Sequence, residues 1–199
     1  MRKTIDYFFT PISPWTYLGH DRFVALARKH DATVNIMPMD LAKVFPVSGG
    51  LPVAKRAPQR QAYRLTELAR WRDHLGIPLN LQPKFASATG ELATRFVLAA
   101  NDRSTDEALA LTGAIMRARW AEEGDIADEA TLATIAQALG QDSAQLAARA
   151  ALPAITAKYE ASTQAALDRQ IFGAPTYVYE DELFWGQDRL DFLARKLAK

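Results

Sequence analysis

The stretch IDYFFTPISPWTYL, residues 5–18, places a strand signal, a break and a helix start next to one another. In the run Ile5–Phe9, apolar side chains recur at every second position, which is the period of a strand. Thr10–Ile12 contains a proline that ends the run. Ser13 then occupies the position of a helix N-cap, and Pro14 the first helical position, which tolerates proline best. The stretch therefore predicts a strand, a short loop and a helix.

The segments that follow extend this start into a strand–helix–strand unit. The helix is expected to run to about Lys29, and Asp31–Ala32 turns the chain into a second strand, Thr33–Met37. A strand, a helix and a second strand in this order imply a parallel pair. The segment Phe45–Pro58 is rich in proline, glycine and basic residues and has no apolar period, so it predicts a loop.

From Gln61 to about Gln170 the sequence contains helical patterns and no convincing strand. Gly76 and Gly140 stop two of these patterns, and about five or six helices are expected in one block. The signals are Leu65, Leu68 and Leu75; the segments Glu91–Asn101 and Thr105 to about Trp120; the stripe Leu132, Ile135, Ala136 and Leu139; and a capping box of Asp142 with Gln145.

Strand signals return near the C-terminus. Thr176–Tyr179 and Leu183–Trp185 predict a hairpin with Glu180–Asp181 at its turn, and Leu190, Leu193 and Leu197 mark a closing helix. The chain is therefore expected to be α/β: a thioredoxin-like fold, βαβ…ββα, with an inserted all-helical domain. Residues 1–45 and 171–199 would form the discontinuous thioredoxin-like domain, and residues 46–170 the insertion.

Composition excludes several classes of function. The 199 residues contain 24 basic and 23 acidic side chains and no cysteine. Without cysteine there is no disulfide, thiolate metal site or dithiol chemistry. No basic run is interleaved with aromatic residues, and neither a secretory signal nor a membrane-spanning stretch is apparent, so we expect a cytoplasmic protein without nucleic-acid or membrane partners. His20, His30 and His74 do not cluster, and no metal site is predicted.

Ser13 has two compatible interpretations. It can be an ordinary N-cap, which is a common use of serine before proline. The start of a helix also presents unpaired N–H groups and partial positive charge, which stabilise an anion and lower the pKa of a thiol. A serine hydroxyl at that place can donate a hydrogen bond to a thiolate. Because the chain has no cysteine, such a thiol would have to come from another molecule.

Two downstream segments have a structural and a functional interpretation as well. Gly173–Thr176 can be a proline at a strand start, or a cis Ala174–Pro175 bond whose flanking backbone pairs with an extended peptide. Trp185–Arg189 can be a turn that opens the last helix, or a segment whose Gln187 and Asp188 hold the α-amino and α-carboxylate groups of a ligand.

With these motifs the chain resembles the 2-hydroxychromene-2-carboxylate isomerases, relatives of the kappa-class glutathione transferases and of DsbA-type oxidoreductases. The segments that carry the resemblance are Ile5–Leu18, Asp125–Ile126, Gly173–Thr176 and Phe184–Leu190. The resemblance implies a homodimer that binds glutathione and a small aromatic substrate. The implied reaction is ring opening and cis–trans isomerisation through a borrowed thiolate, as in covalent catalysis.

The resemblance also implies roles for individual residues. Ser13 would be catalytic and lie beside the glutathione sulfur. The expected cofactor-binding residues are Ala174, Pro175, Trp185, Gly186, Gln187, Asp188 and Arg60, and the expected substrate-binding residues are Trp15, Gly50 and Arg56. One departure concerns the substrate side: where the family often has a lysine in the loop after the second strand, this sequence has Pro46. Arg60 stands where the family has a second lysine and can replace it toward a carboxylate, although arginine and lysine differ in geometry.

Three functions remain open at this point. The first is a glutathione-dependent isomerase of the 2-hydroxychromene-2-carboxylate type. The second is a transferase or peroxidase of kappa type, with the same site but with bond formation to an electrophile. The third is a redox-dead binding module that holds peptides at the Gly173–Thr176 edge. The segment Trp185–Arg189 favours a small ligand over a peptide.

Overall fold

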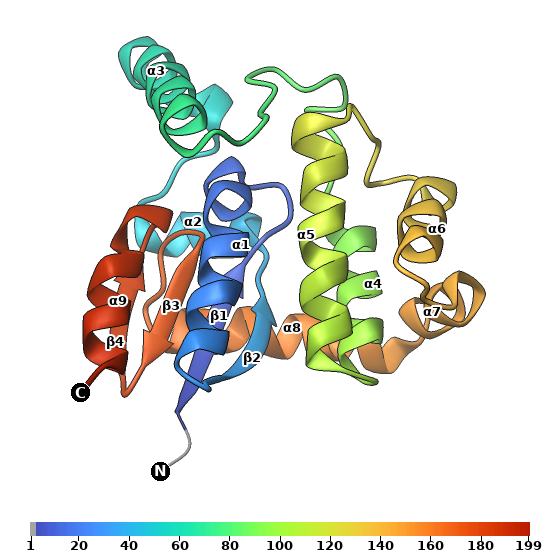
Figure 1. The fold of residues 1–199 in the computed structure, drawn as a ribbon. Helices are drawn as coiled ribbons and strands as arrows, with labels where there is room; N and C mark the ends of the chain where they lie inside the picture. The colour runs from blue at the N-terminus through green and yellow to red at the C-terminus, as the bar shows by residue number, and fades with distance from the viewer. Residues whose placement is uncertain (1–2) are drawn as a thin grey trace.

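The computed structural model describes residues 3–199 as an α/β fold around one four-stranded sheet. The strands stand in the order β2-β1-β3-β4 (Figure 1). β1 is parallel to β2, while β3 runs antiparallel to β1 and β4 antiparallel to β3. Their bounds are β1 Thr4–Phe9, β2 Thr33–Pro38, β3 Thr176–Tyr179 and β4 Glu182–Trp185. The sheet thus joins the two ends of the sequence, as expected for a thioredoxin-like fold.

Helices surround the sheet and form a block beside it (Figure 1). Among residues 3–199, no helix has the length and apolar character needed to cross a membrane. The helices are α1 Pro14–Lys29, α2 Leu41–Ser48, α3 Pro58–Leu75, α4 Glu91–Asn101, α5 Thr105–Ala121, α6 Glu129–Ala138, α7 Ser143–Ala150, α8 Pro153–Asp168 and α9 Leu190–Leu197, with short 3-10 turns at η1 Val53–Lys55 and η2 Gln187–Arg189.

The two faces of the sheet bury different side chains because neighbouring strand residues point to opposite sides. On the face toward α1 and α9, the ring of Tyr7 stacks on Tyr177 with centroids 5.5 Å apart and packs against Phe23 of α1 at 4.5 Å. On the other face, Phe8 packs in a separate cluster with Ala166 at the end of α8. The period of two seen in residues 5–9 therefore fixes which helices cover which face.

The helical block stands against α1. In Figure 1, α5 runs alongside α1, α4 lies behind α5, and α6 and α7 form the outer edge. α3 lies over the start of α1, where Leu68 packs with Tyr17 and Leu18. Residues 46–170, which the sequence assigns to an inserted domain, include α8, and α8 also packs against β2 and α2. The division into two domains stays a prediction.

The loop predicted for Phe45–Pro58 is wrong in part. The chain forms α2 through Ser48 and a 3-10 turn at Val53–Lys55. The missed signal is Asp40, whose carboxylate caps α2 by accepting the Ala42 N–H at 2.8 Å. Only one α2 side chain, Val44, is buried, so the segment shows no apolar period. In addition, Pro46 lies inside the helix, and a proline at such a position argues against a helix in the sequence.

Two local predictions at turns have different outcomes. Glu180 and Asp181 both have positive φ, 49° and 61°, as a two-residue hairpin turn requires. The capping box at Asp142 is only half formed. Asp142 accepts the Gln145 N–H at 3.0 Å, but the Gln145 side chain accepts from Arg103 instead of reaching back to the cap.

Candidate functional site

Ser13 lies at the start of α1 and touches the Gly173–Thr176 loop. Its backbone is extended, and its Oγ accepts the Thr16 N–H at 3.2 Å, as an N-cap does. The same hydroxyl donates to the Ala174 carbonyl at 3.4 Å. This bond is long for O–H···O and therefore weak. The tertiary structure thus brings together the two motifs that the sequence singled out, and it leaves the hydroxyl proton only loosely held.

The first turn of α1 offers positive potential to a ligand. Pro14 has no N–H, and the amides of Thr16 and Tyr17 are bonded to Ser13. Among residues 3–199, no hydrogen-bond acceptor pairs with the Trp15 N–H, and the first turn of α1 contains no acidic residue. An unpartnered amide at an uncompensated helix end favours an anion. The site can therefore hold a thiolate beside Ser13.

The loop that faces Ser13 is fixed by hydrogen bonds on both sides. The Ala174–Pro175 peptide bond is cis, as the sequence suggested. The Thr176 hydroxyl donates to the Gly173 carbonyl at 2.7 Å, and the Gly186 N–H donates to the Pro175 carbonyl at 2.9 Å. Ala174 is half-buried, so a ligand at Ser13 would also meet its backbone.

An aromatic pair stands at the outer edge of this loop. Trp185 and Phe172 are 51% and 42% exposed, and their rings meet edge to face with centroids 4.8 Å apart. A Cβ at Gly173 would come within 2.5 Å of the Trp185 indole nitrogen. Glycine at this position therefore lets the indole approach the loop backbone closely. Phe172 was missed by sequence reasoning, although its position next to the Gly173 motif was a usable signal.

Gln187 points into the protein. Its side chain is 2% exposed, and its amide oxygen and its backbone carbonyl both accept from the Arg22 guanidinium. A Cβ at Gly19 of α1 would come within 2.8 Å of the Gln187 Cβ. Gln187 therefore anchors η2 to α1. Arg22 carried no sequence signal for this role, because its partner lies 165 positions away.

The neighbours of Gln187 are more open. Asp188 is exposed and its carboxylate pairs with Arg189 at 2.6 Å. Gly186 has φ of 103°, and a Cβ there would lie 2.5 Å from the Asp188 carboxylate oxygen. This turn requires glycine for both reasons. It presents a carboxylate at the rim of the loop, where it can pair with an ammonium group.

Two of the expected substrate-binding residues, Gly50 and Arg56, and the expected cofactor-binding residue Arg60 lie at or shortly before the start of α3. Arg60 is exposed, and Arg56 is half-buried with its Nε donating to the Leu51 carbonyl at 2.8 Å. Gly50 lies against the Phe45 ring, and a Cβ at this position would overlap with a ring carbon. Within residues 3–199, no hydrogen bond joins this group to the Ser13–Ala174 contact.

Trp15 is the substrate-side residue nearest to Ser13 in the sequence. It is half-buried and packs in the apolar cluster of Tyr17, Leu18 and Leu68. This cluster joins the first turns of α1 to α3. Trp15 therefore connects the start of α1, where Ser13 lies, to α3.

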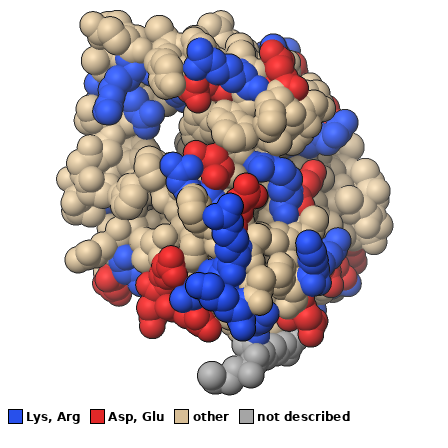
Figure 2. Space-filling model, turned by 60° about the vertical axis from the view of Figure 1, so that its left-hand side comes forward, with Lys and Arg blue, Asp and Glu red and all other residues tan. Residues whose placement is uncertain are grey.

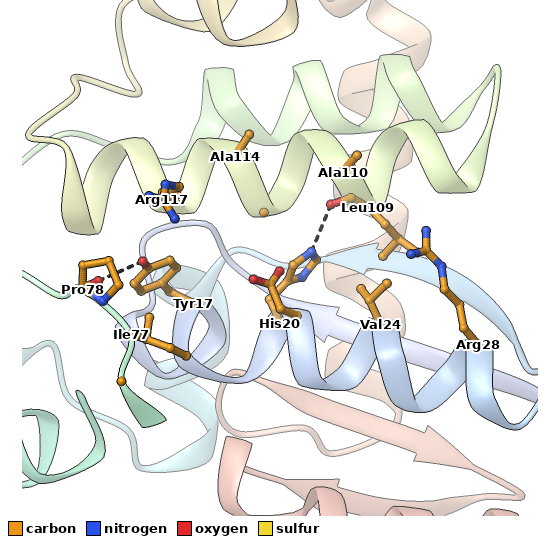
Figure 3. A pocket seen from close by; sticks show the side chains of 13 residues that line it. Tyr17, His20, Val24, Arg28, Ile77, Pro78, Leu109, Ala110, Ala114 and Arg117 are labelled. Carbon is orange, nitrogen blue, oxygen red and sulfur yellow. Dashed lines mark hydrogen bonds between the residues drawn. The ribbon is translucent and has the colours of Figure 1, made fainter. Parts of the chain in front are cut away.

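A hollow of about 520 Å³ lies between α1 and α5 (Figure 3). His20 crosses its floor: Nδ1 accepts from the Tyr7 hydroxyl at 3.1 Å, and Nε2 donates to the Leu109 carbonyl at 3.0 Å. Complete burial lowers the pKa of His20, which keeps the ring neutral near pH 7. At one end the Tyr17 hydroxyl donates to the Pro78 carbonyl at 2.8 Å. These contacts hold α1 against the helical block.

Residues 3–199 contain no cluster of three side chains of the types that bind metal ions.

Comparison with known proteins gives consistent similarities. Residues 4–198 match the family model of the DsbA-like thioredoxin domain. The chain is 30% identical to a 2-hydroxychromene-2-carboxylate isomerase of Sphingobium xenophagum, with 97% of each chain covered. It is 25% identical to glutathione S-transferase kappa 1 of Caenorhabditis elegans, covering 98% of this chain and 91% of the relative. A solved structure of a 2-hydroxychromene-2-carboxylate isomerase superposes with a TM-score of 0.83 at 28% identity, covering 98% of this chain and 94% of that chain.

Proposed function

The chain belongs to the 2-hydroxychromene-2-carboxylate isomerase family of DsbA-like thioredoxin proteins, and on this premise we propose that it is a glutathione-dependent isomerase. Its substrate is a conjugated aromatic acid of the 2-hydroxychromene-2-carboxylate type, as in aromatic catabolism. The proposal includes a cytoplasmic homodimer and the two-domain division at residues 46 and 170.

The contact of Ser13 with Ala174 carries the proposal. It creates a place with a hydroxyl donor, an unpartnered Trp15 amide and an uncompensated helix end, in a chain without cysteine. Those groups fit a thiolate brought by another molecule. Glutathione suits the place because the fixed loop offers the Ala174 backbone to a peptide and Asp188 offers a carboxylate to an ammonium group.

When bound, glutathione supplies a thiolate that adds reversibly to a conjugated double bond, so that this bond becomes single, can rotate, and re-forms when the thiol leaves. Ser13 turns its hydroxyl proton from Ala174 to the sulfur, which lowers the pKa of the thiol. The Trp15 N–H and the α1 dipole stabilise the same negative charge. Ser13 thus keeps the thiol ionised between turnovers.

The remaining residues hold the thiol carrier in place. Ala174 pairs through its backbone with the cysteinyl unit, beside the cis Pro175. Trp185, Gly186 and Asp188 line the γ-glutamyl end. Gln187 acts through the position that it gives η2, since its amide oxygen is bonded to Arg22. On the other side, Arg60 takes the glycyl carboxylate, while Trp15, Gly50 and Arg56 face the substrate.

The test is calorimetric titration with glutathione, followed by an absorbance assay with 2-hydroxychromene-2-carboxylate. We expect binding and glutathione-dependent turnover. The absence of heat at millimolar glutathione would overturn the proposal and would leave a peptide-binding module as the function to test. Light scattering of the purified protein tests the dimer.

The kappa-type transferase is the second candidate, favoured by the similarity to a kappa-class enzyme. It shares the thiolate site but forms a lasting carbon–sulfur bond. Mass spectrometry of the reaction products separates the two functions, because an isomerase returns free glutathione while a transferase consumes it in a conjugate.

A further inference from the structure

The start of α3 bears three arginines, Arg56, Arg60 and Arg64, here called the arginine cluster. Arg60 and Arg64 are one helical turn apart on α3, and Arg56 precedes the helix. Burial lowers the pKa of Arg64, and the positive charge of Arg56 lowers it further. Burial also lowers the pKa of Arg56, and the positive charge of Arg60 adds to this effect. Arg56 therefore lies close enough to Arg60 and to Arg64 for these like charges to repel one another.

Within the described part of the chain, residues 3–199, no acidic side chain compensates the charge of the arginine cluster. The ion pairs within α3 are Arg70 with Glu67 and Arg72 with Asp73. Across residues 3–199, no ion pair forms with a member of the arginine cluster. α3 also starts without a side-chain cap and without an acidic residue in its first turn. An uncapped helix end and three guanidinium groups without an acidic partner among residues 3–199 attract anions for independent reasons.

Arg64 occupies an unusual position on α3. The seam of α3 that packs against α1 consists of Leu68, Trp71 and Leu75. Positions 64, 68, 71 and 75 continue the same spacing, so that Arg64 stands where this seam would place an apolar residue. Arg64 is accordingly half-buried, while Arg60 and Arg70 are exposed. A half-buried arginine without a partner is costly unless a ligand supplies the negative charge.

The arginine cluster lies at the same end of the molecule as Ser13. One turn beyond Arg64, Leu68 packs in one cluster with Trp15, which belongs to the first turn of α1. Figure 1 shows α3 above the start of α1. In Figure 2, Lys and Arg side chains are spread over the face that the view shows, and some of them lie in its upper part beside a hollow.

We infer that Arg64, supported by Arg56, binds the carboxylate of the substrate and thereby restricts the enzyme to anionic substrates. The inference rests on the proposed function and adds to it a specificity residue that the motifs did not indicate. Arg60 remains assigned to the carboxylate of glutathione, so the arginine cluster serves two negative charges from two molecules. A guanidinium suits this task because its fork matches both carboxylate oxygens.

The test uses 2-naphthoate as an aromatic carboxylate probe and 2-naphthamide as its neutral analogue, titrated calorimetrically without glutathione. We expect 2-naphthoate to bind, 2-naphthamide to bind at least tenfold more weakly, and high salt to reduce the difference. In Arg64→Gln the affinity for 2-naphthoate is expected to fall by about tenfold, because the variant loses a charge-assisted hydrogen bond. Glutathione affinity changes by less than about threefold.

Arg70→Gln is the matched control, because it removes an exposed arginine from the same helix; its affinities stay within about twofold of the wild type. Arg64→Lys keeps the positive charge but loses the two-pronged geometry of the guanidinium. Its affinity for 2-naphthoate is expected to lie between those of the wild type and Arg64→Gln. If Arg64→Gln fails to fold, Arg64→Lys decides. Unchanged 2-naphthoate binding in the Arg64 variants, or equal binding of 2-naphthamide, overturns the inference. Missing heat with glutathione overturns the proposed function instead.

Discussion

Helices α1 and α5 run side by side, and each starts at a serine whose hydroxyl accepts a backbone N–H of its own first turn. Ser13 accepts from Thr16 at 3.2 Å, and Ser104 accepts from Glu107 at 3.4 Å. The first turn of α5 contains acidic residues that compensate its helix dipole, whereas the first turn of α1 contains none. The Ser13 hydroxyl also meets a loop from the far end of the chain. The same local cap is thus structural in α5 and a candidate anion site in α1.

The largest effect expected is on turnover. Ser13→Ala should lower kcat by about 10²–10³-fold, the usual loss for a donor that stabilises developing negative charge. Ser104→Ala should stay within about twofold of the wild type, because its hydroxyl only caps α5. Initial rates at saturating glutathione and 2-hydroxychromene-2-carboxylate measure both. Equal losses in the two variants would remove the distinction between the helices.

The second effect concerns a glycine in the middle of each helix. Gly19→Ala should lower the free energy of unfolding by about 1–3 kcal/mol, because its Cβ would lie 2.8 Å from the Gln187 Cβ and 3.3 Å from the Gln187 Cα. Gly113→Ala should stay within about 0.5 kcal/mol, since the gain in helix propensity offsets its crowding, the nearest atom being His20 Cδ2 at 3.1 Å. Urea denaturation measures both, and a neutral Gly19→Ala would contradict the close packing of α1 on η2.

The third effect concerns His20, which joins α1 to α5. Its pKa is lowered in the folded protein. Below about pH 6.5 the unfolded chain takes up a proton at this position that the folded chain does not. Stability should therefore fall as the pH drops from about 6.5, by at most about 1.4 kcal/mol per pH unit, until the folded pKa is reached. Urea midpoints between pH 7.5 and 5.5 measure the slope.

His20→Gln should reduce this slope, and His74→Gln, which replaces an exposed histidine, should keep it. A slope that survives His20→Gln would show that another group titrates, and that the link between α1 and α5 does not depend on a neutral imidazole.

The smallest effect is the one that the two serines share. Ser13→Ala and Ser104→Ala should each cost about 1 kcal/mol of unfolding free energy, the usual value for an N-cap. Thermal and urea unfolding measure it. Similar stability losses together with unequal turnover would separate the structural role of the cap from the catalytic role proposed for Ser13. A much larger loss in Ser13→Ala alone would indicate that its contact with Ala174 is mainly structural.

Much of the fold could be predicted because its signals are local. The alternation in Ile5–Phe9, the start of α1 at Ser13–Pro14 and the hairpin turn at Glu180–Asp181 all appear in the structure as expected. The helix α2 was missed because its stability depends on the Asp40 cap and one buried side chain, Val44, which leaves no periodic pattern.

The contact of Ser13 with the Gly173–Thr176 segment agrees with the expectation from the motifs, but the packing of individual side chains could not be predicted. Gln187 was expected to hold a ligand, and the structure places its side chain inward, bonded to Arg22. The direction of a side chain at a turn depends on whether the helix packed against that turn leaves space for it. Here the opposite helix has Gly19, and this close approach lets Gln187 enter.

The sequence by itself determined most of the order of strands and helices, the cap at Ser13 and the absence of a thiol in the chain, because these follow from local periodicity and from composition. Only the tertiary structure decided that Ser13 meets Ala174, that Gln187 is buried and that Arg64 stands unpaired in the seam of α3. These contacts join segments far apart in the chain. They depend on how the packed helices exclude or admit each side chain, which no local pattern contains.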